Sequence, residues 1–215
     1  MNGVRPHIEA VLFDMDGTLV DSHAAVERAW TYWAEDYGVN ADDVLARAHG
    51  SPAETTARRM LPALGHAEIK KAAARQLEFQ YTDLADVVAC SGAHALISVL
   101  DREDVPWAVV TSADRILAEA RLGAADIRPS VLVTLDDVAW GKPNPEGFLR
   151  ASELLRVDPR RTLVVEDSEV GLAAGRAAGA ITAALNGLDG DLRIRDLAEL
   201  VPLFESMSAK RSGHN

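Results

Sequence analysis

Five short apolar runs, each followed within two residues by a polar residue, constrain the fold of this chain more than any other feature. They lie at residues 8–13, 107–110, 131–133, 163–165 and 180–184. Their length and their content of β-branched residues predict buried strands. Stretches of helical character separate the later runs, at residues 93–101, 115–122, 146–155 and 170–178. This alternation predicts an α/β fold with a Rossmann-like, doubly wound parallel sheet and helices on both faces.

Residues 21–87 interrupt the alternation. The segment is rich in Ala, Glu, Arg and Leu, and it has almost no strand-like runs. Trp30 and Trp33 lie at spacings of three and four residues from Val26 and Tyr37, which marks one face of an amphipathic helix. We therefore predict an all-helical domain at residues 21–87, inserted into a discontinuous core of residues 1–20 and 88–215.

Composition excludes several classes of protein. The chain has 22 Lys+Arg against 33 Asp+Glu, a formal net charge of −11, which opposes general binding to nucleic acid. Cys90 is the only cysteine, so a disulfide scaffold and a cysteine-rich zinc site are ruled out. No apolar run approaches the roughly 18–20 residues that span a bilayer, and residues 1–9 lack the apolar core of a signal peptide. We expect a cytoplasmic protein that is a monomer or a weak dimer, with no membrane or nucleic-acid partner.

Polar side chains follow four of the predicted strands. In an open parallel sheet, ligands bind beyond the carboxyl ends of the strands, so these residues are expected to share one edge. In chain order they are Asp14, Asp16, Thr18, Thr111, Ser112, Lys142, Glu166 and Asp167. The set combines carboxylates, hydroxyls and one amine.

This set of side chains suits phosphoryl transfer. Asp14, Asp16 and Asp167 offer hard oxygen ligands for Mg²⁺, and Thr111 and Lys142 can hold phosphate oxygens. A carboxylate can attack phosphorus and form an acyl phosphate, while a second acid two residues away can protonate the leaving oxygen. Because carboxylates crowded at one edge repel one another, the site is expected to need a metal.

Four motifs resemble those of the haloacid dehalogenase superfamily of phosphohydrolases in order and spacing. They are Asp14-Met15-Asp16-Gly17-Thr18, Val110-Thr111-Ser112, Gly141-Lys142-Pro143 and Glu166-Asp167-Ser168. The resemblance extends over residues 8–186. The helical segment after the first motif resembles the cap of the subfamily that contains phosphoglycolate phosphatases, sugar phosphatases and β-phosphoglucomutase. Residues 21–30, together with His49-Gly50, look most like bacterial sugar phosphatases and glycerol-phosphate phosphatases.

The resemblance implies a role for each catalytic residue. Asp14 would be the nucleophile and a Mg²⁺ ligand. Asp16 would act first as the general acid and then as the base that activates water, and its backbone carbonyl would also bind the metal. Thr111 would hydrogen-bond the transferring phosphoryl group, and Lys142 would neutralise charge on Asp14 and the phosphate.

The same resemblance implies the remaining metal and substrate contacts. Asp167 would bind the metal directly, and Glu166 would lie nearby or act through water. The cap would close over the site, exclude water and select the substrate. The candidate substrate-binding residues are Thr18, Ser112, Trp30, His49 and Gly50.

Taken singly, these features also fit structural roles. An Asp-x-Asp sequence occurs in turns, Thr111-Ser112 is a suitable cap for the helix that follows it, and Lys142 before a proline is typical of a solvated surface. Trp30 suits helix packing, and His49 suits a surface or packing position. A purely structural explanation of all four motifs would require four independent coincidences at one edge of the sheet.

We predict a Mg²⁺-dependent phosphatase of small phosphorylated metabolites, sugar or polyol phosphates, that acts through an aspartyl-phosphate at Asp14. One alternative is a β-phosphoglucomutase-like phosphotransferase, for which a basic cap loop is expected; Ser51-Pro52-Ala53 contains no arginine. A second is a haloacid dehalogenase, which does not need the acid at Asp16. A third is a non-catalytic phospho-ligand-binding relative, although no motif residue is missing. A phospho-accepting receiver domain is shorter and lacks the helical insert.

Overall fold

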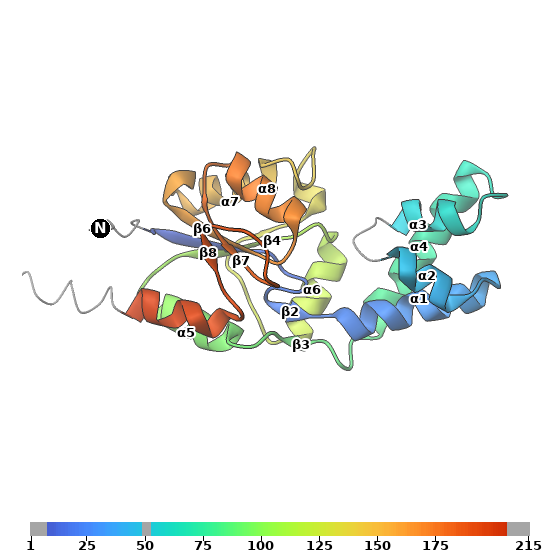
Figure 1. The fold of residues 1–215 in the computed structure, drawn as a ribbon, viewed down its shortest axis with the longest axis horizontal. Helices are drawn as coiled ribbons and strands as arrows, with labels where there is room; N and C mark the ends of the chain where they lie inside the picture. Colours follow the sequence, from blue (N-terminus) through green and yellow to red (C-terminus); the bar gives the residue numbers. More distant parts are fainter. Residues whose placement is uncertain (1–7, 49–52, 206–215) are drawn as a thin grey trace, which may run out of the picture. The chain divides into compact units, whose positions relative to one another are not determined.

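Among residues 8–48 and 53–205, which the computed structural model describes, six strands form one parallel sheet in the order β5-β4-β1-β6-β7-β8 (Figure 1). The strands are β1 (Ala10–Phe13), β4 (Trp107–Val110), β5 (Leu132–Val133), β6 (Thr162–Glu166), β7 (Ile181–Ala184) and β8 (Leu192–Arg193). Every residue of β1 is fully buried between β4 and β6, where Leu12 lies opposite Ala108 and Val164. A strand covered on both faces must be apolar throughout, which explains why the first run does not alternate with polar residues.

Helices cover the sheet on both faces. They are α5 (Ala93–Arg102), α6 (Arg115–Ala124), α7 (Glu146–Leu155) and α8 (Glu169–Ala177). Figure 1 shows α7 and α8 on one face and α5 on the other. On the first face, Phe148 of α7 and Ala174 of α8 pack with Leu12 and Val164 in the core. The predicted fold class, a Rossmann-like parallel sheet flanked by helices, is confirmed.

Short elements complete this part of the chain. The 3₁₀ helices are η1 (Leu135–Asp137), η2 (Pro159–Arg161) and η3 (Leu197–Leu200). A small antiparallel sheet pairs β2 (Val20–Asp21) with β3 (Val88–Ala89), with Val20 opposite Ala89. Neither this sheet nor β8 was predicted from the sequence, because a strand of two residues is too short to show an apolar period.

Contacts divide the described residues into two units, residues 8–21 with 88–205 and residues 22–48 with 53–87. The second unit contains α1 (His23–Tyr37), α2 (Ala41–Ala48), α3 (Ala53–Met60) and α4 (His66–Thr82). Its core is built around Trp33, which is fully buried and donates a hydrogen bond from Nε1 to the carbonyl oxygen of Ala72 at 2.8 Å. None of the helices in the described parts of the chain is long and apolar enough to cross a membrane.

An arginine links the two ends of the helical unit. Arg28, in the second turn of α1, donates from Nε to Asp83 at 2.8 Å and from Nη2 to Asp86 at 2.7 Å, and both carboxylates follow the end of α4. The two carboxylates raise the pKa of Arg28. The first and last helices of the unit are therefore tied where the chain enters and leaves it.

Candidate functional site

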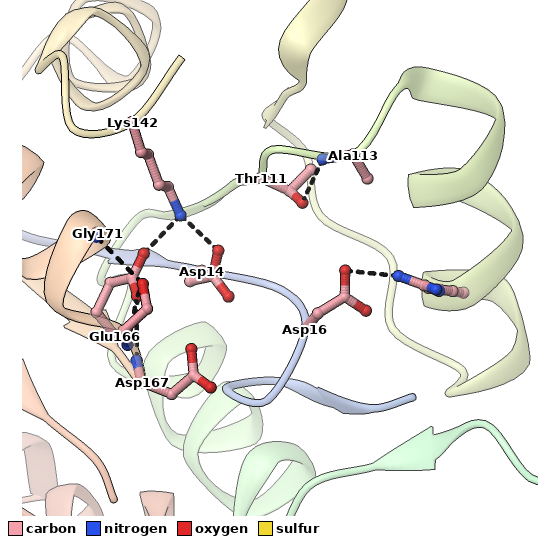
Figure 2. A network of polar contacts seen from close by, with 10 residues as sticks. Asp14, Asp16, Thr111, Ala113, Lys142, Glu166, Asp167 and Gly171 are labelled. Carbon is pink, nitrogen blue, oxygen red and sulfur yellow. Dashed lines mark hydrogen bonds and ion pairs between the residues drawn. The ribbon is translucent and has the colours of Figure 1, made fainter. Parts of the chain in front are cut away.

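A buried lysine joins the carboxyl ends of two neighbouring strands (Figure 2). Asp14 directly follows β1, and Glu166 is the last residue of β6, beside it in the sheet. Lys142 forms an ion pair with Asp14, and its Nζ lies 2.6 Å from Oε1 of Glu166. The side chain of Glu166 is fully buried, and those of Lys142 and Asp14 are about nine-tenths buried. Charges at such depth are tolerated in a fold only when they are paired.

Burial and ion pairing shift the pKa values of Asp14 and Lys142 in opposite directions. Burial raises the pKa of Asp14 well above its ordinary value, Lys142 opposes this increase, and Glu166 adds to it. Burial by itself would lower the pKa of Lys142, but the two carboxylates raise it above its ordinary value. The lysine therefore stays protonated and supplies a fixed positive charge beside Asp14.

The second oxygen of Glu166 is held by the start of α8. Oε2 accepts hydrogen bonds from the backbone N–H of Asp167 and of Ser168, both at 3.1 Å, and from the Ser168 hydroxyl at 2.8 Å. Gly171 makes room for this arrangement, because a Cβ there would overlap the Glu166 carboxyl group. Since the other oxygen contacts Lys142, Glu166 is fixed at both ends of its carboxylate.

Asp167 completes a cluster of acidic oxygens. One oxygen from each of Asp14, Glu166 and Asp167 lies within 4.8 Å of the others. Burial raises the pKa of Asp167 to about 6, and Glu166 adds to this increase. The carboxyl group of Asp167 packs against Gly17, whose φ of +81° favours glycine and where a Cβ would overlap the carboxyl oxygen.

This donor set fits a hard divalent cation. Three carboxylates face one lysine, so negative charge remains in excess at the cluster. Mg²⁺ prefers one or two carboxylates and several waters. Because both oxygens of Glu166 are already engaged, Asp14 and Asp167 are the better direct ligands, and Glu166 suits a contact through water.

Asp167→Asn is expected to stabilise the metal-free protein at pH 7. A raised pKa means that the folded state binds this proton more tightly than the unfolded chain does. Ionised Asp167 therefore destabilises the fold above about pH 6, and the penalty is lost as the pH falls from about 6 to about 4. We place the gain from asparagine at about 1–2 kcal/mol, because solvent still reaches and screens this carboxylate. Urea unfolding in EDTA measures it, and the gain should be smaller at pH 5 than at pH 7.

Asp158→Asn is the matched control for this measurement. Arg160 lowers the pKa of Asp158 to about 2, so asparagine at this position should reduce stability at pH 7 instead of raising it. If the Asp167→Asn variant and the parent protein are equally stable at pH 7, the ionised Asp167 carboxylate does not destabilise the fold and the prediction is wrong.

Asp16 lies outside the cluster of Asp14, Glu166 and Asp167. Its Oδ2 forms an ion pair with Nη1 of Arg121 in α6 at 2.7 Å, drawn as the dashed line from Asp16 in Figure 2. Arg121 was not among the site residues predicted from the sequence. A signal was present, because a cation at helical spacing among apolar residues marks a charge on the buried face of a helix.

Thr111 lies at the same edge, directly after β4, and is buried. Its Oγ1 accepts a hydrogen bond from the backbone N–H of Ala113 at 3.1 Å. The cap of α6 is instead Asp114, which accepts from the N–H of Leu117 at 2.8 Å. The helix-cap interpretation of Thr111 is therefore wrong, and Thr111 lies at the same sheet edge as Asp14 (Figure 2). Ser112 is exposed to solvent.

The remaining candidate substrate-binding residues lie in different parts of the chain. Thr18 is fully buried, and its hydroxyl has no hydrogen-bond partner within the described part of the chain. Trp30 is buried in the helical unit, with its ring 5.2 Å from that of Trp33 and edge-on to it, so it has a packing role there; its contact with substrate stays a prediction. His49 and Gly50 lie outside the described residues.

Trp140 is exposed, two residues before Lys142 in the chain. Together with Thr111 and Lys142 it lines a small hollow at the edge of the sheet.

Comparisons with known proteins show the family of this chain. A family model described as haloacid dehalogenase-like hydrolase matches residues 8–179. The chain is 37% identical over 201 residues to hexitol phosphatase A of Escherichia coli, a match that covers 93% of each protein. It is also 37% identical over 190 residues to 2-deoxyglucose-6-phosphate phosphatase 1 of Saccharomyces cerevisiae, covering 80% of this chain and 77% of the relative. Among solved structures, a hydrolase from Pseudomonas syringae superposes with a TM-score of 0.75 at 25% identity, over 94% of this chain and 99% of that one.

Proposed function

Because this chain belongs to the haloacid dehalogenase-like hydrolases, we propose that it is a Mg²⁺-dependent phosphatase of sugar or polyol phosphates. It is a phosphoric monoester hydrolase, as its named phosphatase relatives are. The substrate class is supported by the names of those relatives, which act on hexitol and deoxyhexose phosphates. The observation that carries the proposal is the position of Asp14 at the sheet edge, where it is buried, paired with Lys142 and part of an acidic cluster with Glu166 and Asp167.

In the proposed reaction, Asp14 attacks phosphorus and forms an O–P bond while the bond from phosphorus to the sugar oxygen breaks. Asp16 gives its proton to the departing oxygen, which leaves as an alcohol. Water then attacks the aspartyl-phosphate and gives a proton to Asp16, and the bond between Asp14 and phosphorus breaks. Inorganic phosphate is released, and both carboxyl groups return to their starting states.

Two groups hold the phosphoryl oxygens in this proposal. Lys142 brings a permanent positive charge next to Asp14, and Thr111 presents its hydroxyl at the same edge. Thr18 and Ser112 are proposed as further substrate contacts. Mg²⁺, held by Asp14, Asp167 and the backbone carbonyl of Asp16, with Glu166 acting through water, would neutralise charge on the transferring group.

The same proposal gives the two units different roles. The sheet-containing unit carries every described motif residue, and the helical unit is proposed as a cap that selects the substrate. His49, Gly50 and Trp30 are assigned to that cap. The cytoplasmic location and the monomeric or weakly dimeric state remain predictions from the sequence.

A panel of phosphorylated metabolites tests the function. Phosphate release is measured with hexose, hexitol, pentose, glycerol and glycolate phosphates, in Mg²⁺ and in EDTA. We expect turnover of a few hexose or hexitol phosphates, at least about tenfold above glycolate phosphate in kcat/KM, because selective contacts to sugar hydroxyls are worth more than about 1.4 kcal/mol. Folded, metal-bound protein that releases no phosphate from any member would contradict the proposal and favour a mutase that needs a bisphosphate primer, or a binding protein.

A further inference from the structure

A charged side chain occupies the buried face of α6. The buried residues of this helix are Leu117, Ala118, Arg121 and Leu122, so arginine stands where the helical period calls for an apolar residue. The Arg121 side chain is only 4% exposed. Burying a guanidinium group is unfavourable unless a carboxylate compensates its charge. The carboxylate that pairs with Arg121 therefore indicates the role of this residue.

That partner is Asp16, the proposed proton donor. The Nη1–Oδ2 distance of 2.7 Å is that of a charge-assisted hydrogen bond, and the Asp16 side chain is about one-third exposed. An ion pair with one member withdrawn from solvent is screened much less than a surface pair. The contact therefore restrains the Asp16 carboxyl group. In the proposed reaction this group carries a proton before the leaving oxygen departs and is ionised afterwards, and the Arg121 N–H can donate to a carboxyl oxygen in both states.

The two buried cations at this edge serve different carboxylates. Lys142 contacts Asp14 and Glu166, and Arg121 contacts Asp16. Asp16 is absent from the close acidic cluster, and in Figure 2 its carboxylate reaches toward the ion-pair partner instead of toward Lys142. The carboxylate proposed to move a proton is thus held apart from the side-chain carboxylates proposed to bind metal.

We propose that Arg121 is a positioning residue that holds the Asp16 carboxylate in the orientation needed for proton transfer to the leaving oxygen. The inference rests on the proposed function, in which Asp16 donates this proton. Arg121 touches neither substrate nor phosphorus in the proposal and acts only through Asp16.

Leaving-group dependence separates this role from a structural one. An alkoxide must be protonated as it departs, but p-nitrophenolate departs without help. For Arg121→Met we expect kcat/KM to fall about 100-fold with the best sugar or hexitol phosphate, and less than about fivefold with p-nitrophenyl phosphate. The ratio kcat/KM is the correct readout, because it reports the steps up to formation of the aspartyl-phosphate. Arg121→Lys should recover about tenfold on the sugar phosphate. An equal loss on both substrates, or no loss, would overturn the inference.

Two further variants sharpen the test. In an Asp16→Asn background, Arg121→Met should change kcat/KM by less than about twofold, because the group it positions is already absent. Arg115→Met is the matched control: Arg115 is also in α6 and also pairs with a carboxylate, Asp137 at 2.6 Å, but is about two-fifths exposed. It should leave the ratio between the two substrates unchanged. Multiplicative losses in the Asp16→Asn background would show that Arg121 does not act through Asp16.

A stability cycle tests the contact without turnover. Thermal unfolding in EDTA is measured for the parent, Asp16→Asn, Arg121→Met and the double variant. If Arg121 holds Asp16, the shifts in unfolding midpoint caused by the two single substitutions should not add up to the shift in the double variant. Additive shifts would overturn the inference whatever the activity. A parent protein that hydrolyses neither ester would instead contradict the proposed function, and the stability cycle would still decide whether Arg121 holds Asp16.

Discussion

Asp14→Asn is expected to lower kcat by at least about 10⁴-fold with every substrate of the phosphate panel. An amide oxygen does not form the acyl phosphate, so the first O–P bond cannot be made. Asparagine has nearly the same volume as aspartate, and Lys142 keeps its second partner, Glu166, at 2.6 Å. The loss should therefore come from chemistry and not from unfolding. Phosphate release under saturating substrate and Mg²⁺ measures it, with circular dichroism to verify the fold.

Asp126→Asn is the control for this variant. Asp126 is 80% exposed, and its contact with Arg128 is a surface pair, so activity should match that of the parent. Mass spectrometry of acid-quenched parent enzyme should also find phosphate on the peptide that contains Asp14. Near-normal hydrolysis by Asp14→Asn would remove the nucleophile from the mechanism.

Removal of divalent metal has the second largest expected effect. Dialysis against EDTA should reduce phosphate release by more than about 100-fold, and Mg²⁺ should restore it. The reason is electrostatic: Asp14, Glu166 and Asp167 approach within 4.8 Å, and one lysine does not balance three carboxylates and an incoming phosphate dianion. Ca²⁺, which takes about six to eight oxygen ligands at longer distances, should restore less activity than Mg²⁺.

Unfolding measurements check the same site independently of turnover. Mg²⁺ that binds only the folded protein should raise the unfolding temperature, and above Kd the shift should grow with the logarithm of the Mg²⁺ concentration. Asp167→Asn should weaken this shift, whereas the distant surface change Asp126→Asn should not. Full activity in protein shown to be metal-free by elemental analysis would contradict the assignment of a metal to Asp14 and Asp167.

Buried strands were the part of the fold most open to prediction. Each residue of β1 is covered on both faces, so the segment that forms it must be apolar and short. The predicted helix at residues 146–155 has the same bounds as α7. By contrast, β2, β3 and β8 are two residues long each, and their pairing is a property of the assembled chain.

Some features of the candidate site were likewise predicted from the sequence, and others were not. Because parallel strands end at one edge, the sequence alone predicted that Asp14, Thr111 and Glu166 would lie together. It did not predict that both oxygens of Glu166 are engaged. The helical spacing of Trp30 did indicate a packing role, and Trp30 is enclosed by its own helical unit.

The sequence by itself determined the sheet, the helices around it and the residues at its carboxyl edge, since hydrophobic periodicity and chain order are local properties. Only the tertiary structure decided which cation serves which carboxylate. Lys142 reaches Asp14 and Glu166, and Arg121 reaches Asp16, from loops and helices remote in the chain. Side-chain pairing over such separations depends on how the elements pack in the folded chain, and no local pattern encodes that packing.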